Sequence, residues 1–237
     1  MVELREVCMQ FEEKTVLDGF TLKVEQEERL VVMGQTGSGK STILRLILGT
    51  LRKLQRVRRH IGMVYQYSAL LSSRNVRDNV ALPLEELTDK SRAEIDKIVD
   101  EKLDLVGMKD AKDLLPAELS GGMRKRVSIA RALVLEPELV LFDEPSAGLD
   151  PVIASVIDEL IISLSEKSKV TSITVTHEMD SAFRIGTRMA MLYQGKIIEQ
   201  AEPEEFKQSE NPVVAQFLSG STEGPILEDS QDAITKK

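Results

Sequence analysis

Gly34-Gln35-Thr36-Gly37-Ser38-Gly39-Lys40-Ser41 is the stretch of sequence that decides the fold. It matches the phosphate-loop pattern G-x-x-x-x-G-K-[ST]. Before it, Leu30-Val31-Val32-Met33 is an unbroken apolar run typical of a buried parallel strand, and residues 41–48 carry apolar side chains at helical spacing. A strand, a glycine-rich turn and a helix N-terminus in this order predict a phosphate site. The glycines let backbone N–H groups converge on an anion, and the helix dipole adds positive charge.

The residues of this loop have distinct expected roles. Lys40 is expected to reach the β- and γ-phosphates of a nucleotide, and Ser41 to supply an oxygen to Mg²⁺. The residues expected to contact the nucleotide are Gly34, Gln35, Thr36, Gly37, Ser38, Gly39, Lys40, Ser41 and Thr42. The alternative, a glycine-rich turn with a chance lysine, does not account for the strand and the helix on either side.

Two adjacent carboxylates follow a second apolar run, Leu139-Val140-Leu141-Phe142. This strand would deliver Asp143 and Glu144 to its carboxyl end, the edge where doubly wound sheets bind ligands. Asp143 suits Mg²⁺ coordination through water, and Glu144 is placed as the base that orients or deprotonates an attacking water. An Asp-Glu-Pro turn after a strand is common in isolation. Together with the phosphate loop it predicts nucleotide hydrolysis.

Composition excludes several classes of function. The 237 residues are 42% hydrophobic and carry a net charge of −8 without a long basic stripe, which argues against nucleic-acid binding. Cys8 is the only cysteine, so an intramolecular disulfide and a CxxC metal site are excluded. No signal peptide and no apolar run long enough to cross a bilayer are found. We therefore expect a cytosolic chain that reaches membranes only through a partner.

Strand and helix patterns alternate along the chain. The apolar patterns predict strands at 3–11, 15–24, 29–33, 61–65, 139–142, 170–176, 189–193 and 196–200, with helices at 41–48, within 75–108, at 120–135, at 151–166 and from 178 onward. This alternation predicts an α/β fold with a mainly parallel core sheet covered on both faces. Gln194-Gly195 is expected to turn a hairpin. Residues 219–237 are polar and aperiodic, and we expect them to be disordered unless something binds them.

Leu119-Ser120-Gly121-Gly122-Met123 resembles the signature motif of ATP-binding-cassette (ABC) proteins, which usually ends in Gln. A hydroxyl and two glycines at a helix N-terminus can approach a γ-phosphate closely. In that family the phosphate belongs to ATP on the opposite subunit, so Ser120, Gly121 and Gly122 are implied to contact the partner's nucleotide. One signature and one phosphate loop in the chain imply a homodimer that binds two ATP.

The other motifs of the family follow in order. Gln66 resembles the Q-loop residue that touches Mg²⁺ or water and senses the transport partner, and Asp150 ends a D-loop-like Ser146-Ala147-Gly148-Leu149-Asp150 that would contact nucleotide across the dimer. His177 resembles the switch histidine, and Phe11 the aromatic residue that stacks on adenine. The resemblance implies ATP and Mg²⁺ as cofactors, Glu144, His177, Gln66 and Lys40 as catalytic residues, and Ser41, Gln66 and Asp143 as metal ligands.

The resemblance covers about residues 2–218, and we expect a domain at 1–218 with a tail at 219–237. It implies a P-loop NTPase of the ABC ATPase type, with an antiparallel β-subdomain and a helical subdomain at about 70–135. One feature departs from the family. Only Leu51-Arg52-Lys53-Leu54-Gln55-Arg56-Val57 stands where a hairpin normally lies. Either the β-subdomain is shortened or a segment is missing from this sequence, and we favour the second.

The sequences of three segments resemble those of one branch of the family, the ATPases of MCE-type phospholipid transporters that maintain lipid asymmetry. These segments are Met123, the 68–80 stretch and Leu218-Ser219-Gly220-Ser221-Thr222-Glu223-Gly224-Pro225-Ile226. The branch implies an integral-membrane permease whose coupling helix enters a groove formed by 66–80, an MCE-domain partner, and a peripheral place on the cytoplasmic face of the inner membrane. Gly224-Pro225-Ile226 would reach onto the neighbouring subunit or form a loose tail.

Two alternatives stay open. The chain could serve another transporter branch, such as amino-acid import or lipoprotein release, with the same core chemistry. A non-transport cassette ATPase acting on DNA or ribosomes is less favoured. Such proteins typically have a long coiled-coil insertion or two cassettes in one chain, neither of which is present here, and the acidic charge argues further against it.

Overall fold

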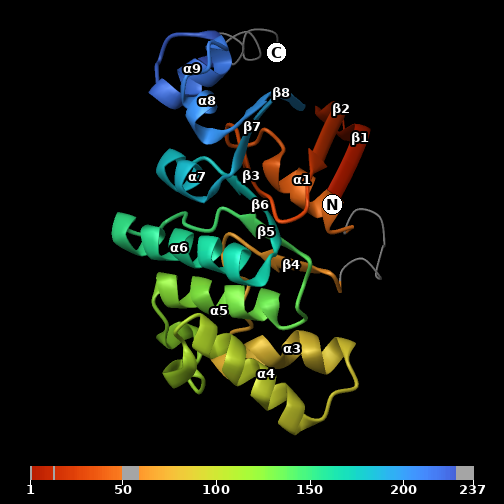
Figure 1. Cartoon of the computed structure of the whole chain (residues 1–237), viewed down its shortest axis with the longest axis vertical. Helices are drawn as coiled ribbons and strands as arrows, with labels where there is room; N and C mark the ends of the chain where they lie inside the picture. Colours follow the sequence, from red (N-terminus) through yellow and green to blue (C-terminus); the bar gives the residue numbers. More distant parts are fainter. Residues whose placement is uncertain (1, 13, 50–58, 228–237) are drawn as a thin grey trace.

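A computed structural model describes residues 2–12, 14–49 and 59–227 (Figure 1). Strands β1 (Val2–Phe11) and β2 (Lys14–Val24) form a separate antiparallel sheet. The second sheet has the order β4-β5-β6-β3-β7-β8 and is parallel apart from the β7–β8 hairpin. Its strands are β3 (Arg29–Met33), β4 (Ile61–Val64), β5 (Leu139–Asp143), β6 (Thr171–Thr176), β7 (Arg188–Tyr193) and β8 (Lys196–Ala201). The predicted mainly parallel core sheet and antiparallel subdomain are confirmed.

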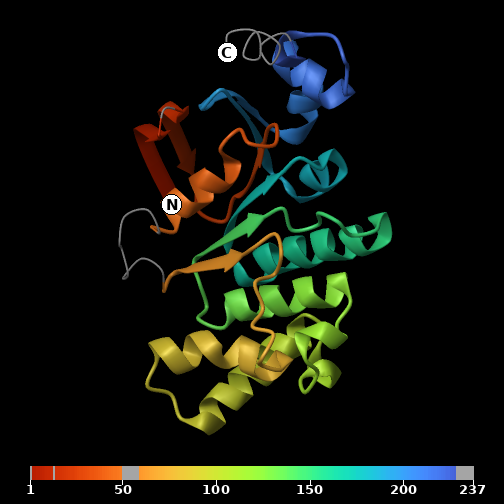
Figure 2. The same cartoon turned by 180° about the vertical axis from the view of Figure 1, so that it is seen from behind.

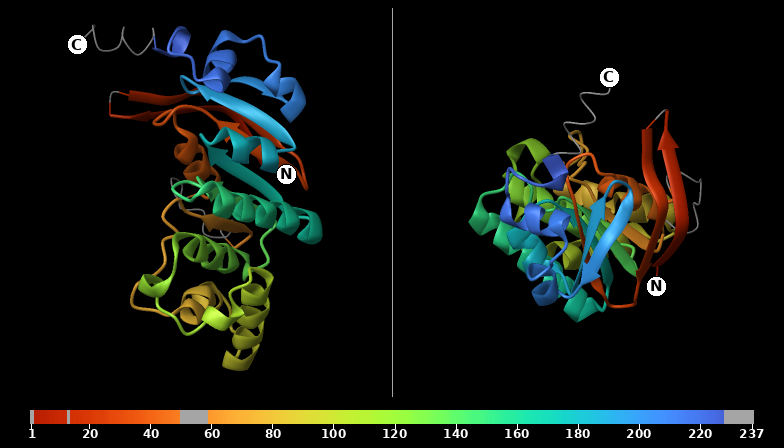
Figure 3. Two further views of the ribbon diagram at one scale, coloured as in Figure 1. Left: turned by 90° about the vertical axis from the view of Figure 1, so that its left-hand side faces the viewer. Right: turned by 90° about the horizontal axis from the view of Figure 1, so that it is seen from above.

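Helices cover both faces of the larger sheet, so its central strands are buried on each side. Along β3, Leu30 and Val32 join one hydrophobic cluster, whereas Val31 and Met33 join the other. The first cluster lies under α1 (Lys40–Ile47) and the β1–β2 ribbon, which stands along one side of the molecule in Figure 3. Figure 2 shows α6 (Pro151–Ser168) and α7 (Met179–Ile185) on the opposite side.

A helical layer packs beyond α6. It contains α3 (Val76–Leu87), α4 (Arg92–Leu105) and α5 (Gly121–Leu133), with short 3₁₀ turns at Lys109–Ala111 and Pro116–Glu118 (Figure 1). The predicted apolar stripe of α4 faces this core: Ile95, Val99 and Leu103 are buried. Gly107 has φ +65° immediately beyond the end of α4, as expected for a glycine that ends a helix. No helix among the described residues is both long enough and apolar enough to span a bilayer.

The C-terminal segment differs from the sequence expectation. After α8 (Pro203–Lys207) and α9 (Pro212–Ser219), the chain packs back on its own domain instead of leaving it. The Ile226 amide donates to Gln216 Oε1 at 2.8 Å, and the Ile226 side chain is buried. The prediction of disorder is therefore wrong for residues 220–227, because the buried amide of Gln216 closes this turn. Residues 228–237, and the departure predicted at 51–57, lie outside the described residues.

Candidate active site

Four parallel strands end at one edge of the sheet, and the chemically active residues follow each of them. The phosphate loop follows β3, Gln66 follows β4, Glu144 follows β5 and His177 follows β6. They meet at a cavity of about 290 Å³. Its lining residues are Val16, Thr36, Gly37, Gly39, Lys40, Ser41, Thr42, Gln66, Glu144 and His177. The fold thus brings into one site residues that lie far apart in the sequence.

The phosphate loop needs glycine at two positions for steric reasons. A Cβ on Gly34 would lie 2.5 Å from the Leu192 carbonyl oxygen, and one on Gly39 would lie 2.9 Å from Val16 Cγ1. Both residues also have positive φ, which side chains disfavour. No sequence motif predicts Val16 as a site residue. Val16 can be recognised only from the folded structure, because strand β2 approaches the phosphate loop there.

Lys40 is buried in the loop, and its ammonium group donates to the carbonyl oxygens of Gly34 at 2.7 Å and Gln35 at 3.0 Å. Burial lowers the pKa of Lys40, while Glu144 and Asp143 oppose that shift. Among the described residues, Ser38 Oγ is buried without a hydrogen-bond partner. A lysine held at the base of the loop and an unsatisfied hydroxyl fit the phosphates of a nucleotide.

Ser41 and Asp143 form the candidate metal position. Ser41 Oγ donates to Asp143 Oδ1 at 2.9 Å. Burial raises the pKa of the Asp143 carboxyl, and the Ser41 hydrogen bond acts in the opposite direction. The described residues contain no group of three His, Cys, Asp or Glu side chains able to hold a metal by themselves. One carboxylate and one hydroxyl beside a phosphate site fit Mg²⁺, which keeps waters and takes phosphate oxygens as ligands.

Glu144 is held on every side. Its Oε1 lies 2.8 Å from His177 Nδ1, and its Oε2 accepts hydrogen bonds from Thr176 Oγ1 at 2.9 Å and from the His177 backbone N–H at 3.3 Å. The Glu144 side chain is mostly buried, whereas that of His177 is about half exposed. A carboxylate fixed this way beside a phosphate site can orient a water. Thr176 was not predicted, because its contact depends on β5 and β6 being neighbours.

Nine of the predicted site residues are absent from the lining of this cavity: Gly34, Gln35 and Ser38 of the phosphate loop, Asp143 beside Ser41, and five residues on other segments. Ser120 caps α5, where its Oγ accepts from the Met123 N–H at 3.2 Å, and Asp150 caps α6 by accepting from the N–H groups of Val152 and Ile153. Phe11 is half exposed on β1. Gly121 and Gly122 face Leu149 and Ile153, so closely that a Cβ on Gly122 would lie 2.5 Å from Ile153 Cγ2. These residues, Phe11, Ser120, Gly121, Gly122 and Asp150, lie outside the cavity of their own chain.

A second cavity adjoins the first, with a volume of about 510 Å³. Val16 and Gly37 line both cavities, so the two are neighbours along the phosphate loop. The other lining residues are Lys14, Thr15, Asp18, Ser38, Gln194 and Gly195. No sequence motif marks the β2 residues of this group, because only their position beside the loop distinguishes them.

Comparison with known proteins shows which family this chain resembles. The family described as ABC transporter matches residues 17–147. The chloroplastic protein trigalactosyldiacylglycerol 3 of Arabidopsis thaliana is 38% identical over 262 residues, covering 95% of this chain and 75% of that protein. MlaF, the ATP-binding protein of the intermembrane phospholipid transport system of Haemophilus influenzae, is 35% identical over 245 residues, covering 95% of this chain and 93% of that protein.

Two further relatives extend this comparison. The methionine import ATP-binding protein MetN 1 of Yersinia pestis is 38% identical over 253 residues, covering 97% of this chain and 74% of that protein. A solved dimeric ATP-binding cassette in a post-hydrolysis state, bound to ADP and phosphate, matches with a TM-score of 0.76 at 30% identity. That match covers 86% of this chain and 99% of the other.

The alignments with the three sequence relatives are all longer than the 237 residues of this chain, so those relatives contain residues that this chain lacks. The family match nevertheless spans more than half of the chain and includes the phosphate loop, the signature motif and both carboxylates. The chain therefore belongs to the ABC transporter family, as one of its ATP-binding ATPase components.

Proposed function

We propose that this protein binds Mg-ATP between two copies of itself and uses hydrolysis to drive a membrane permease that moves phospholipid. The observation that carries the proposal is the composite nature of the site. The phosphate loop, Gln66, Glu144 and His177 share one cavity, whereas Ser120, Gly121, Gly122 and Asp150 lie outside it. A second copy would bring its Ser120 helix N-terminus to the open side of the nucleotide. The dimeric solved relative supports this arrangement.

The residues of the chain divide the chemistry among themselves. Lys40 and the loop amides would hold the phosphates, and Phe11 would stack on adenine. Ser41 and Gln66, with Asp143 through a water, would hold Mg²⁺, which supplies charge neutralisation to the transferred phosphate. Glu144 would orient the attacking water and accept its proton, and His177 would hold Glu144 and contact the γ-phosphate. Ser120 and Gly122 of the second copy would complete the phosphate contacts.

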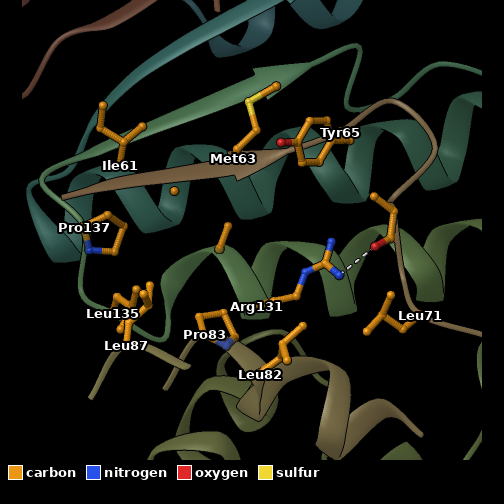
Figure 4. Close-up of a pocket in the computed structure, with 13 residues that line it drawn as sticks. Ile61, Met63, Tyr65, Leu71, Leu82, Pro83, Leu87, Arg131, Leu135 and Pro137 are labelled. Carbon is orange, nitrogen blue, oxygen red and sulfur yellow. Dashed lines mark hydrogen bonds between the residues drawn. The ribbon is translucent and has the colours of Figure 1, made fainter. Parts of the chain in front are cut away.

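A groove next to the site suits a helix of the permease. Its cavity of about 360 Å³ lies between β4 and α3, with α5 at its base (Figure 4). Most of its lining is apolar, including Tyr65, Leu71 and Leu87, and Arg131 is a polar group within it. An amphipathic helix could bury its apolar face here. Because Gln66 follows Tyr65 directly, a helix in the groove would contact the segment that also lines the nucleotide cavity. This supports a peripheral place on the cytoplasmic face of the inner membrane.

Phospholipid as cargo is supported by the likeness to MlaF. It is also supported by the three segments whose sequences resemble the ATPases of MCE-type phospholipid transporters. An MCE-domain protein is the further partner that this branch implies. The second candidate is amino-acid import. It is favoured by the likeness to MetN 1, which is 38% identical to this chain, against 35% for MlaF. The cassette chemistry is the same in both, so only the partner and the cargo distinguish the two candidates.

The test is to purify the protein with its native membrane partners and to reconstitute the complex in liposomes. We expect labelled phospholipid to move only with ATP, and we expect no movement with Glu144→Gln, which should still bind ATP. Hydrolysis at the normal rate by Glu144→Gln would remove Glu144 from its assigned role. A complex that contains no MCE-domain protein and that responds to an amino acid but not to phospholipid would support the import alternative and overturn the phospholipid proposal.

A further inference from the structure

A buried lysine lies behind the candidate active site. Lys125 is on α5, four residues beyond its first residue Gly121, and only 4% of it is exposed. Its ammonium group donates to the Gln66 carbonyl oxygen at 2.6 Å and to the Glu144 carbonyl oxygen at 3.0 Å. These two residues follow the neighbouring strands β4 and β5. Lys125 therefore joins the backbones of the two segments that supply Gln66 and Glu144 to the cavity.

Burying this cation is costly, because an ammonium group loses its hydration and gains no direct carboxylate partner among the described residues. Burial lowers the pKa of Lys125 to about 8, against the opposing effect of Asp143, Glu144 and Glu178. A methionine would fill a similar volume without this cost. We attribute the burial of this ammonium group to the two backbone carbonyl oxygens that its N–H groups hold, those of Gln66 and Glu144.

One of the held residues has a strained backbone. Glu144 has φ +48°, in the left-handed region, which is strained for a residue other than glycine. Such a conformation persists only where the surroundings determine it from several sides. The Glu144 N–H donates to the Val175 carbonyl oxygen at 2.9 Å, and the Glu144 carbonyl accepts from Lys125. Without Lys125 the Glu144 carbonyl would keep only the longer hydrogen bond, 3.4 Å, from the Ala147 N–H.

The other held segment is strained as well. Ser68 has φ +59° and Ala69 has φ +46°, and neither is glycine. Arg131, also on α5, donates to the carbonyl oxygens of both residues at 2.7 Å. Lys125 and Arg131 thus hold the segment from Gln66 to Ala69 at both of its ends from one helix. Of the two, only Lys125 also reaches the segment that contains Glu144.

We propose that Lys125 is a positioning residue for ATP hydrolysis: its N–H groups fix the backbone of Glu144 relative to Gln66, so that the Glu144 carboxylate keeps its place beside the nucleotide. The proposal rests on the role assigned to Glu144 above. Lys125 touches no reacting atom. Its removal should therefore slow the chemical step while leaving ATP binding almost unchanged.

The test compares Lys125→Met, Lys125→Gln and the control Arg126→Met in the full chain. Methionine removes the donors, and glutamine keeps N–H donors; both side chains are one atom shorter than that of lysine. Arg126 is a cation of the same helix whose contacts are the carbonyls of Val106 and Gly107, away from the site. The rate would be expressed per bound nucleotide, measured with a fluorescent ATP analogue, so that loss of folded protein does not count as loss of rate.

We expect Lys125→Met to lower kcat about tenfold with KM for Mg-ATP within about twofold. Lys125→Gln should lie between Lys125→Met and wild type, at about threefold below wild type, and Arg126→Met should match wild type. Wild-type kcat in Lys125→Met, or equal losses in the methionine and glutamine variants, would overturn the proposal. If Lys125→Met does not fold, Lys125→Gln decides alone: a wild-type kcat in that variant overturns the proposal. Glu144→Gln is measured alongside, because activity in that variant would instead contradict the proposed function.

Discussion

Glu144 illustrates how single residues in this protein depend on their neighbours. Its carboxylate is held by Thr176 and His177, its N–H by Val175 and its carbonyl by Lys125. Glu144 and Lys40 could be predicted from the sequence, because each lies in a contiguous motif whose order reflects its chemistry. Thr176, Lys125 and Val16 could not, because their contacts join segments that are adjacent only after the strands have paired. The geometry of the Glu144 carboxylate is thus a property of the folded edge of the sheet.

The Thr176 hydroxyl can be tested with a matched control on the same strand. Thr176→Val removes the donor to Glu144 Oε2 at constant shape, and we expect kcat to fall about tenfold with little change in KM. Thr174→Val is the control, because the Thr174 hydroxyl is buried without a hydrogen-bond partner among the described residues. Steady-state ATPase kinetics would compare the two. Equal kcat values for both variants would show that Thr176 does not position Glu144.

At the scale of elements, apolar periodicity predicted most of the helices and strands, because each buries one face or both. The α4 stripe and the hairpin at Gln194-Gly195 are examples. The C-terminal turn at 220–227 was missed for the opposite reason. Its order comes from one buried amide, Gln216, and one apolar side chain, Ile226, within a polar sequence. The hydrophobic pattern of the sequence does not predict a turn that is held in this way.

Helices α3 and α4 are joined by Arg77, whose Nε donates to Asp96 Oδ1 at 2.8 Å and whose Nη1 donates to Asp78 Oδ1 at 2.6 Å. The Arg77 hydrogen bond holds the pKa of Asp96 below its ordinary value of 3.8. A lowered carboxyl pKa stabilises the fold above the pKa of the unfolded chain, and this stability is lost as the pH falls through the folded value. The ion pair should therefore contribute fully at pH 7 and fade below about pH 4.

We expect Arg77→Met to lower the free energy of unfolding at pH 7, and we expect its difference from wild type to shrink below about pH 4. Denaturant titrations at both pH values would measure this. Arg92→Met is the control, because Arg92 is exposed and lies 3.6 Å from Asp96, a surface pair of small effect. A difference that does not change with pH would assign the effect of Arg77 to packing instead.

At the scale of the whole molecule, we propose that a second chain completes the ATP site. The signature residues Ser120 and Gly122 and the helix cap Asp150 lie outside the cavity that the phosphate loop forms. This division was predicted only through the resemblance to a family, because nothing in the pattern of one chain shows what a second copy contributes. The groove between β4 and α3, which we propose receives the permease, includes Tyr65, the neighbour of Gln66.

Mixing two inactive variants tests the composite site most directly. Lys40→Ala should disable the phosphate loop, and Ser120→Arg should disable the signature. In a mixed dimer, one site carries both defects, and the other combines the intact loop of one chain with the intact signature of the other. We predict that each variant alone is inactive and that an equal mixture recovers ATPase activity, up to about a quarter of the wild-type rate. No recovery, in a mixture shown to contain mixed dimers, would contradict a site shared between two chains.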